Sequence, residues 1–254
     1  MNTLATPVRE NFEAHRGRIY RRYVSATFTV LDPKTVDGLR PRAADLRKLI
    51  RQHFPPDRGA SILDLGCGHG ALIHFARACG YLNIQGVDCS PEQVAAARRL
   101  GLDGVREGDL LETLYCLAEE SLDCVVTFDV IEHFTKNELL ALVDEVSRVL
   151  RGGGRWIIHA PNGESPFCGR MLYGDFSHEI AFTRQSLSQL LLASGFNTVE
   201  CRSDILAVTG FKRFVRWVIW KSILGMLRVW IAAETGHTAR DAIFSQNLLA
   251  VAFK

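Results

Sequence analysis

The sequence lacks the features of a secreted, disulfide-stabilised or strongly nucleic-acid-binding protein. It has seven cysteines, an odd number, and none of them forms a Cys-x-x-Cys pair. Such a set predicts neither a zinc site nor a disulfide framework, and it favours a reducing, cytoplasmic compartment. The formal net charge is only +2 over 254 residues. Because no large positive excess is present, we expect no nucleic-acid partner.

Long uncharged apolar runs are also missing. The stretch from Met1 to Arg22 is polar and rich in arginine, without the apolar segment of a secretory signal. No internal repeat or low-complexity segment stands out. The hydrophobic fraction of 47% is enough to bury one large core, with or without a small appendage. These features again favour a cytoplasmic globular protein.

Strand-like and helix-like patterns alternate through the middle of the chain. Strands are expected at 61–65, 84–87, around 105, and at 122–128, 155–159, 198–202 and 247–253, with helices at 43–54, 71–79, 91–100, 136–150 and 183–194. Alternating helices and near-continuously apolar strands predict an α/β fold, with a mostly parallel sheet and helices on both faces. Ligands of such sheets bind at the carboxyl ends of the strands, so the chemistry is expected there.

A glycine-rich loop, residues 66–70, follows the first of these strands. Its glycines permit a tight turn and the close approach of a ligand to the backbone. The same spacing also satisfies a permissive dinucleotide pattern, which is typical of nicotinamide-dependent dehydrogenases. Asp64 disfavours that interpretation, because a carboxylate just before the loop would repel a pyrophosphate and attract an ammonium group. The alternative is that Asp64 only caps local backbone N–H groups.

Acidic residues also follow the next three strands. Asp88 ends the second strand, where an acid can accept hydrogen bonds from both hydroxyls of a ribose, and Cys89 comes next. Asp109 and Leu110 follow the third strand, within reach of an adenine ring, although Gly-Asp is also a common turn. Asp129 ends the fourth strand. This series predicts a nucleoside-binding edge.

The series of motifs resembles the class I S-adenosylmethionine-dependent methyltransferases. It consists of 62–70, 86–88, 108–110, 129–134 and 150–154. The resemblance covers about 61–201 and implies a Rossmann-like seven-stranded sheet whose last strand is antiparallel. It also implies S-adenosyl-L-methionine as the cofactor. The expected cofactor-binding residues are Asp64, Gly66, Cys67, Gly68, Gly70, Asp88, Cys89, Asp109, Leu110 and Asp129.

A narrower resemblance points to the methyl acceptor. The chain is similar to the small-molecule and quinone-type branch of the family, and its second half is similar to methyltransferases encoded with glycan and polysaccharide biosynthesis enzymes. The segments that carry this similarity are 161–162, 173–179, 181–183 and 193–196. They imply O-methylation of a small hydroxyl compound, such as a sugar or glycan precursor. A quinone-type or N-methyltransferase and a non-catalytic cofactor-binding partner subunit are the alternatives.

A hydroxyl acceptor requires a base for its proton. His178 is the first candidate, because an imidazole titrates near neutrality and its loop borders the expected acceptor site; Asp175 could orient it. His133 is the second candidate and His159 the third, whereas Glu132 is interpreted as a helix cap. In the alternative interpretation, His178 only shapes its loop. No compact ligand spacing predicts a metal site, although three residues are conceivable ligands: Asp129, Asp175 and His178.

Residues 211–231 combine three tryptophans with five basic residues. The charges interrupt any span of about twenty apolar residues, so no transmembrane helix is expected. A lid or dimer helix packed on the sheet and a helix lying at the membrane interface, near lipid-linked substrates, are the two interpretations. The predicted organisation is a helical N-terminal cap at 1–58, the core at 59–204, a helical insert at 205–243 and the last strand at 244–254.

Overall fold

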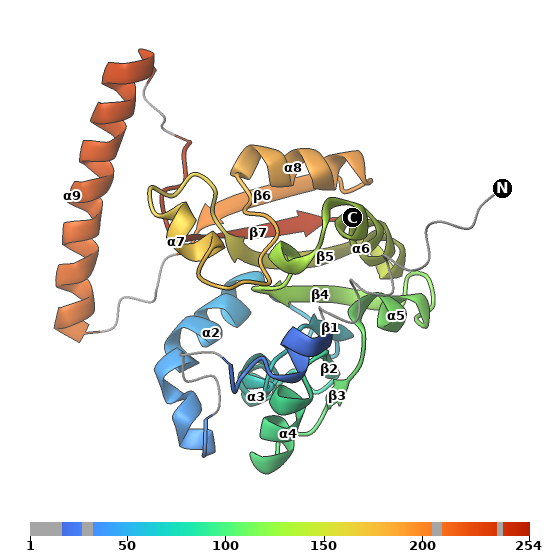
Figure 1. Cartoon of the computed structure of the whole chain (residues 1–254). Coiled ribbons are helices and arrows are strands. Elements are labelled where there is room, and N and C mark those ends of the chain that lie inside the picture. The colour runs from blue at the N-terminus through green and yellow to red at the C-terminus, as the bar shows by residue number, and fades with distance from the viewer. Residues whose placement is uncertain (1–16, 27–32, 205–209, 238–240) are drawn as a thin grey trace.

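The computed structural model describes residues 17–26, 33–204, 210–237 and 241–254, and within them seven strands form one sheet (Figure 1). The strands are β1 (Ile62–Leu65), β2 (Ile84–Asp88), β3 (Val105–Glu107), β4 (Leu122–Phe128), β5 (Leu150–Pro161), β6 (Thr198–Ser203) and β7 (Asn247–Phe253). Their order is β3-β2-β1-β4-β5-β7-β6, and β7 runs antiparallel to both of its neighbours. The predicted Rossmann-like sheet with an antiparallel last strand is confirmed.

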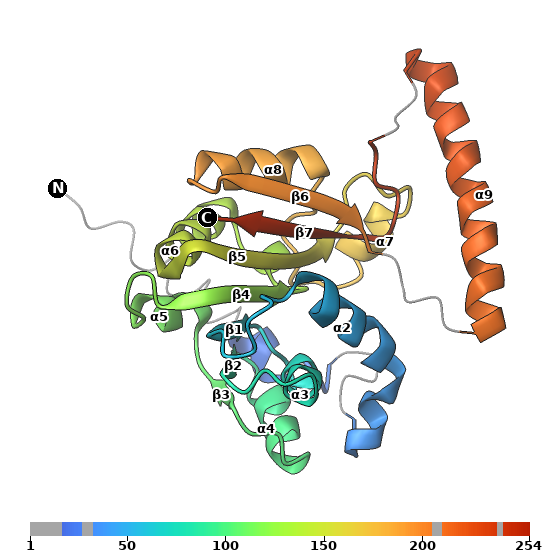
Figure 2. The ribbon, with the colours of Figure 1, turned by 180° about the vertical axis from the view of Figure 1, so that it is seen from behind.

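Helices surround the sheet (Figure 2). They are η1 (Val36–Leu39), α2 (Arg40–His53), α3 (Ala71–Ala78), α4 (Pro91–Arg99), α5 (Leu110–Tyr115), η2 (Ile131–His133), α6 (Lys136–Val149), α7 (Cys168–Leu172), α8 (Arg184–Ala193) and α9 (Gly210–Thr235). One hydrophobic cluster joins α2 and α3 to the sheet, and a second joins α5, α6 and α8. Successive strand residues alternate between the clusters, as Ile62 and Leu63 do, so the sheet is buried on both faces.

Three elements differ from the sequence prediction. Strand β5 begins at Leu150, directly after α6, rather than near 155. The glycines at 152–154 therefore lie inside an irregular stretch of the strand, where Gly153 has a φ of +79°. Helices α5 and α7 were not predicted, because segments of 6 and 5 residues are too short to show a helical period.

Helix α9 stands apart from the sheet (Figure 1). None of its residues is buried, and an ion pair of 3.3 Å between Arg213 Nη1 and Asp45 Oδ1 joins it to α2. The interpretation of this helix as a lid packed on the sheet is therefore wrong. Among the described helices, none has both the length and the apolar character needed to cross a bilayer. Parts of the predicted cap and insert fall outside the described residues, namely 1–16, 27–32, 205–209 and 238–240.

Asn162 fastens the end of β5 to the chain that enters β7. It is fully buried, and its amide donates to the carbonyl oxygens of Ile243 and Ser245, the latter at 2.8 Å. Its Oδ1 accepts from the backbone N–H of Glu164 at 3.0 Å. Three backbone groups of the β5–β7 junction thus depend on one side chain for their hydrogen bonds.

Asn162→Ala is expected to lower the free energy of unfolding by about 2–4 kcal/mol, because it leaves buried backbone groups without partners. Urea denaturation followed by circular dichroism measures the change. The matched control is Asn137→Ala, whose side chain is exposed on α6; it is expected to change stability by less than about 0.5 kcal/mol. Equal losses in the two variants would contradict the role of Asn162.

Candidate functional site

The loop between β1 and α3 has a backbone that only glycine adopts easily. Gly66, Gly68 and Gly70 have φ values of +70°, +55° and +81°. A side chain at Gly66 would overlap Val130 from the segment after β4. A Cβ at Gly86 in β2 would stand 2.6 Å from the Cys67 sulfur. The predicted glycine loop is thus packed between β2 and the β4 end, with its backbone open to close approach.

Asp64 lies beneath this loop with an unsatisfied carboxyl group. The residue is 1% exposed, and its Oδ1 has no hydrogen-bond partner. Burial raises the pKa of Asp64 to about 8; Asp88 adds to the rise and Arg42 opposes it. The alternative in which Asp64 caps the loop lacks the hydrogen bond it requires. A buried acceptor of this kind costs free energy unless a ligand supplies a donor.

Asp88 holds the loop and the next helix in place. Its Oδ2 accepts from the backbone N–H of Gly68 at 2.7 Å, and its Oδ1 accepts from that of Ser90 at 2.8 Å. Burial raises the pKa of Asp88, while these two hydrogen bonds oppose the rise. Each carboxylate oxygen retains acceptor capacity, so both could also bind ribose hydroxyls. The bond to Gly68 was not predicted, because it joins residues from different strand ends.

Asp109 and Leu110 have clear roles in the fold. Asp109 is exposed and caps α5, with Oδ1 accepting from the backbone N–H of Glu112 at 2.9 Å. Leu110 is 7% exposed and belongs to the core cluster beneath α5 and α6. Their contact with an adenine ring stays a prediction.

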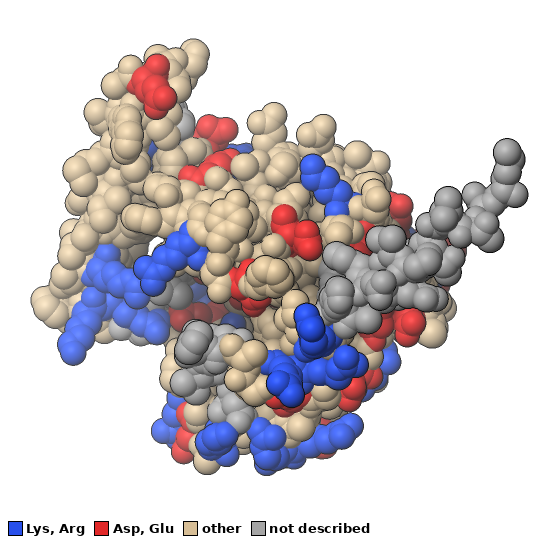
Figure 3. Space-filling model, viewed as in Figure 1, with Lys and Arg blue, Asp and Glu red and all other residues tan. Residues whose placement is uncertain are grey.

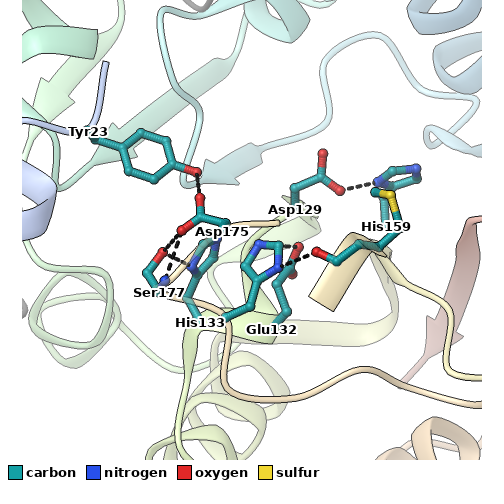
Figure 4. A network of polar contacts seen from close by, with 9 residues as sticks. Tyr23, Asp129, Glu132, His133, His159, Asp175 and Ser177 are labelled. Carbon is teal, nitrogen blue, oxygen red and sulfur yellow. Dashed lines mark hydrogen bonds and ion pairs between the residues drawn. The ribbon is translucent and has the colours of Figure 1, made fainter. Parts of the chain in front are cut away.

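Asp129 and His159 form a close pair at the ends of β4 and β5 (Figure 4). Asp129 Oδ1 lies 2.6 Å from His159 Nδ1, and Asp204 Oδ2 lies 3.3 Å from Nε2. Burial lowers the pKa of His159, but Asp129 and Asp204 together raise it by more, and the result is a pKa of about 10. The imidazole is therefore protonated at neutral pH and has no lone pair to accept a proton. The third candidate base is wrong for this reason.

His133 belongs to a chain of hydrogen bonds that reaches the N-terminal segment (Figure 4). Tyr23 donates to Asp175 Oδ2 at 3.0 Å, and Ser177 Oγ donates to Asp175 Oδ1 at 2.6 Å. Since the Ser177 proton goes to Asp175, the 2.9 Å contact between Ser177 Oγ and His133 Nδ1 is donated by the imidazole. Burial lowers the pKa of His133 to about 4, with a further contribution from His178, so this imidazole is neutral.

The side chain of Asp175 thus orients His133 through Ser177. The prediction that Asp175 orients His178 is wrong, because the Asp175 carboxylate instead accepts a hydrogen bond from the hydroxyl of Ser177. His178 instead donates from Nδ1 to the carbonyl oxygen of Met171 at 3.1 Å. The rings of His133 and His178 meet edge to face, with centroids 4.7 Å apart. The two histidines predicted as catalytic are therefore neighbours.

Glu132 completes this group, and the sequence interpretation missed it. The residue is fully buried, and neither carboxylate oxygen has a hydrogen-bond partner. Its Oε1 lies 4.0 Å from His178 Nε2. Burial raises the pKa of Glu132 well above its ordinary value, with Asp129 adding to the rise. The helix-cap interpretation is wrong, because the carboxylate caps no backbone N–H.

Residues 17–26 lie across the edge that carries these groups. The backbone N–H groups of Val24 and Ser25 donate to Glu92 Oε2, at 2.7 and 3.0 Å, at the start of α4. Tyr23 reaches Asp175 on the opposite side. The segment therefore bridges the nucleoside side of the site to the histidine side.

A cavity of about 540 Å³ opens beside Asp129 and His159. Its other walls come from α2 and from the ends of β6 and β7. The volume suits a small molecule. Neither the glycine loop nor Asp88 lines this cavity, so it lies apart from the expected nucleoside position.

Comparisons with known proteins agree with this arrangement. Residues 62–154 match the family model described as a methyltransferase domain. A solved S-adenosylmethionine-dependent methyltransferase from Archaeoglobus fulgidus superposes with a TM-score of 0.64 at 22% identity, covering 85% of this chain and 94% of that one. Likeness at that identity speaks for the fold alone.

Two curated relatives are similar in sequence. A probable S-adenosylmethionine-dependent methyltransferase from Mycolicibacterium smegmatis is 32% identical over 147 residues, which are 56% of this chain and 54% of the relative. A ubiquinone biosynthesis O-methyltransferase from Xylella fastidiosa is 30% identical over 111 residues, 42% of this chain and 44% of the relative. The chain therefore spans about half the length of these relatives.

The strand order, the glycine loop with its two acids and the matched segment agree with one another. Residues 62–154 therefore match a methyltransferase domain, within a fold similar to that of S-adenosylmethionine-dependent methyltransferases.

Proposed function

We propose that this protein transfers a methyl group from S-adenosylmethionine to a hydroxyl group of a small molecule, such as a sugar or glycan precursor. The observation that carries the proposal is the unsatisfied carboxyl group of Asp64 beneath the glycine loop. The ammonium group of the methionine moiety would supply the missing donor. A dinucleotide would instead bring a pyrophosphate against this acid, which disfavours a dehydrogenase.

The reaction needs alignment and a proton acceptor. The sulfonium is already an activated leaving group, so holding donor and acceptor in line supplies most of the catalysis. The acceptor hydroxyl must lose its proton as its oxygen attacks the methyl carbon. His178 is the proposed base, with the Asp175–Ser177–His133 chain fixing its neighbour.

A quinone-type acceptor is the second candidate. The similarity to a ubiquinone biosynthesis O-methyltransferase favours it. Both acceptors present a hydroxyl, so the chemistry of the two candidates is shared. An N-methyltransferase would need no base for an amine that is already neutral, and a non-catalytic partner subunit would bind the cofactor without turnover.

Asp64→Asn is expected to weaken the binding of S-adenosylhomocysteine by about 10- to 100-fold, as measured by calorimetry, because a charge-assisted hydrogen bond is lost. In the wild type, affinity should increase from pH 6 to pH 8. The carboxyl group is protonated below its pKa of about 8 and must release that proton to bind an ammonium group. The variant should lose this dependence.

The matched control for that experiment is Asp103→Asn, which removes an exposed acid after α4 and should leave both affinity and pH dependence unchanged. Tight NAD binding by the wild type, with none of S-adenosylhomocysteine, would contradict the proposed cofactor.

His178→Ala is expected to lower turnover by about 100-fold or more, since general base catalysis contributes roughly 10²–10⁴-fold. Affinity for S-adenosylhomocysteine should stay within about twofold, because His178 lies on the acceptor side. Methyl transfer from labelled S-adenosylmethionine to candidate sugars and phenols supplies the assay. Unchanged turnover would rule out the base role.

We further propose that α9 lies on an anionic membrane surface. Its exposed apolar side chains include Phe211, Val229 and Trp230, which are 80%, 70% and 68% exposed. The helix carries five basic residues and one acid, Glu234. Figure 3 shows basic side chains gathered at one end of α9, beside α2. Exposed aromatics together with basic residues are typical of interfacial helices.

The double variant Val229→Ser, Trp230→Ser is expected to reduce co-sedimentation with phosphatidylserine-containing vesicles by about tenfold, because it removes buried apolar area at the interface. Leu82→Ser, at a side chain 79% exposed far along the sequence, is the matched control and should bind as the wild type does. Absence of wild-type binding, or a self-association that the double variant abolishes, would favour a dimer helix instead.

A further inference from the structure

Three potential metal ligands lie close together: Glu132 and His133, which follow β4, and His178, in the loop after α7. One ligand atom from each residue lies within 4.8 Å of the others. Two of the three residues are buried, and His178 has a side chain only 11% exposed. No two of them are joined by a conventional hydrogen bond, since the approach of His178 to Glu132 is 4.0 Å. The group thus forms a compact polar cluster.

The two histidines use the same ring nitrogen, Nδ1, as a hydrogen-bond donor. His178 donates from Nδ1 to the Met171 carbonyl, which can only accept. His133 donates from Nδ1 to Ser177, whose own proton goes to Asp175. In both histidines Nδ1 is thus the donor to a neighbouring oxygen. Metal-binding histidines commonly have this arrangement, with the other ring nitrogen donating to a carbonyl or to a carboxylate-linked partner.

Glu132 supplies the second, independent observation. Both of its oxygens are fully buried, and neither has a hydrogen-bond partner. A carboxyl group in such a position is costly unless a donor or a cation compensates it. The backbone of Glu132 is held firmly, because its carbonyl oxygen accepts from the N–H of Glu179 at 2.8 Å. The backbone of Glu132 therefore holds the residue in its buried position, since the side chain makes no hydrogen bond.

From these observations we infer that Glu132, His133 and His178 bind a divalent transition-metal ion. Two imidazole nitrogens with one carboxylate oxygen suit Zn²⁺ or Fe²⁺ better than Mg²⁺ or Ca²⁺, which prefer oxygen ligands. Ligand atoms of a tetrahedral zinc site stand about 3.3 Å apart, given bonds of about 2.0–2.1 Å. The three side chains would close by at most about 1.5 Å on binding, within reach of small rotations about their side-chain bonds.

A site with three protein ligands keeps an open coordination position. If the proposed methyltransferase function holds, that position would face the acceptor side, and the ion would lower the pKa of a hydroxyl bound to it. With the ion bound, His178 would act as a ligand, and its role as a base would apply only to the metal-free protein. The metal site itself rests on the geometry alone and not on that function.

Calorimetry with Zn²⁺ on the full-length protein, after removal of metals with EDTA, tests the inference. The wild type is expected to bind one Zn²⁺ per chain and to gain thermal stability from it. Glu132→Gln and His178→Ala should each weaken binding by about 100-fold or more. Ser177→Ala, which removes only the support of His133, should weaken it by about 10- to 100-fold.

Two further measurements separate a ligand role from a structural one. Metal-free Glu132→Gln should melt at the same temperature as the metal-free wild type or higher, because it removes an uncompensated buried acid. His237→Ala, an exposed histidine at the end of α9, should bind Zn²⁺ as the wild type does. A wild type that binds no Zn²⁺, or Glu132 and His178 variants that bind it undiminished, would overturn the site.

The affinity for S-adenosylhomocysteine distinguishes this inference from the proposed function. It should be unchanged in Glu132→Gln. If the wild type bound Zn²⁺ but not S-adenosylhomocysteine, the result would contradict the proposed function and still support the metal site.

Discussion

The fold must hold two buried carboxyl groups whose oxygens lack hydrogen-bond partners, and the rest of the structure depends on this constraint. Asp64 lies beneath the glycine loop and Glu132 follows β4; one oxygen of Asp64 and both oxygens of Glu132 are buried and accept no hydrogen bond. Each such group costs free energy in the free protein. The fold around them must therefore be stable enough to hold them there. A bound cation, either an ammonium group or a metal ion, would compensate the buried carboxyl group and so gain binding free energy.

Both acids lie at the edge formed by the carboxyl ends of the strands. Asp64 is next to the glycine loop, and Glu132 is next to the histidines. Asp64 lies in β1, beneath the loop that Asp88 holds through Gly68. Glu132 belongs to the histidine cluster that Asp175 holds through Ser177. Asp88 thus fixes the loop backbone beside Asp64, and Asp175 fixes the His133 ring beside Glu132. This division supports the proposal of a nucleoside position beside Asp64 and an acceptor position beside Glu132.

The strands, the glycine loop and its acids could be predicted because their signals are local. Asp64, Gly66 and Asp88 stand at fixed places relative to apolar runs, and those runs become the parallel strands. The histidine cluster could only be approximated. Its members were named, yet Asp175 was paired with His178 instead of His133, His159 was taken as a base, and Glu132 was taken as a cap. The contacts that decide these roles join residues 30 to 46 positions apart, from Asp129–His159 to Glu132–His178.

The sequence by itself determined the alternation of strands and helices and the set of polar residues at the strand ends, since periodicity and glycine placement act over a few neighbouring residues. Only the tertiary structure decided which charge each group carries and which neighbour it serves. His159 is protonated because Asp129 meets it across two strands, while His133 is neutral because burial outweighs its neighbours. Burial and pairing of charges depend on what the folded chain brings together, and no local pattern records that.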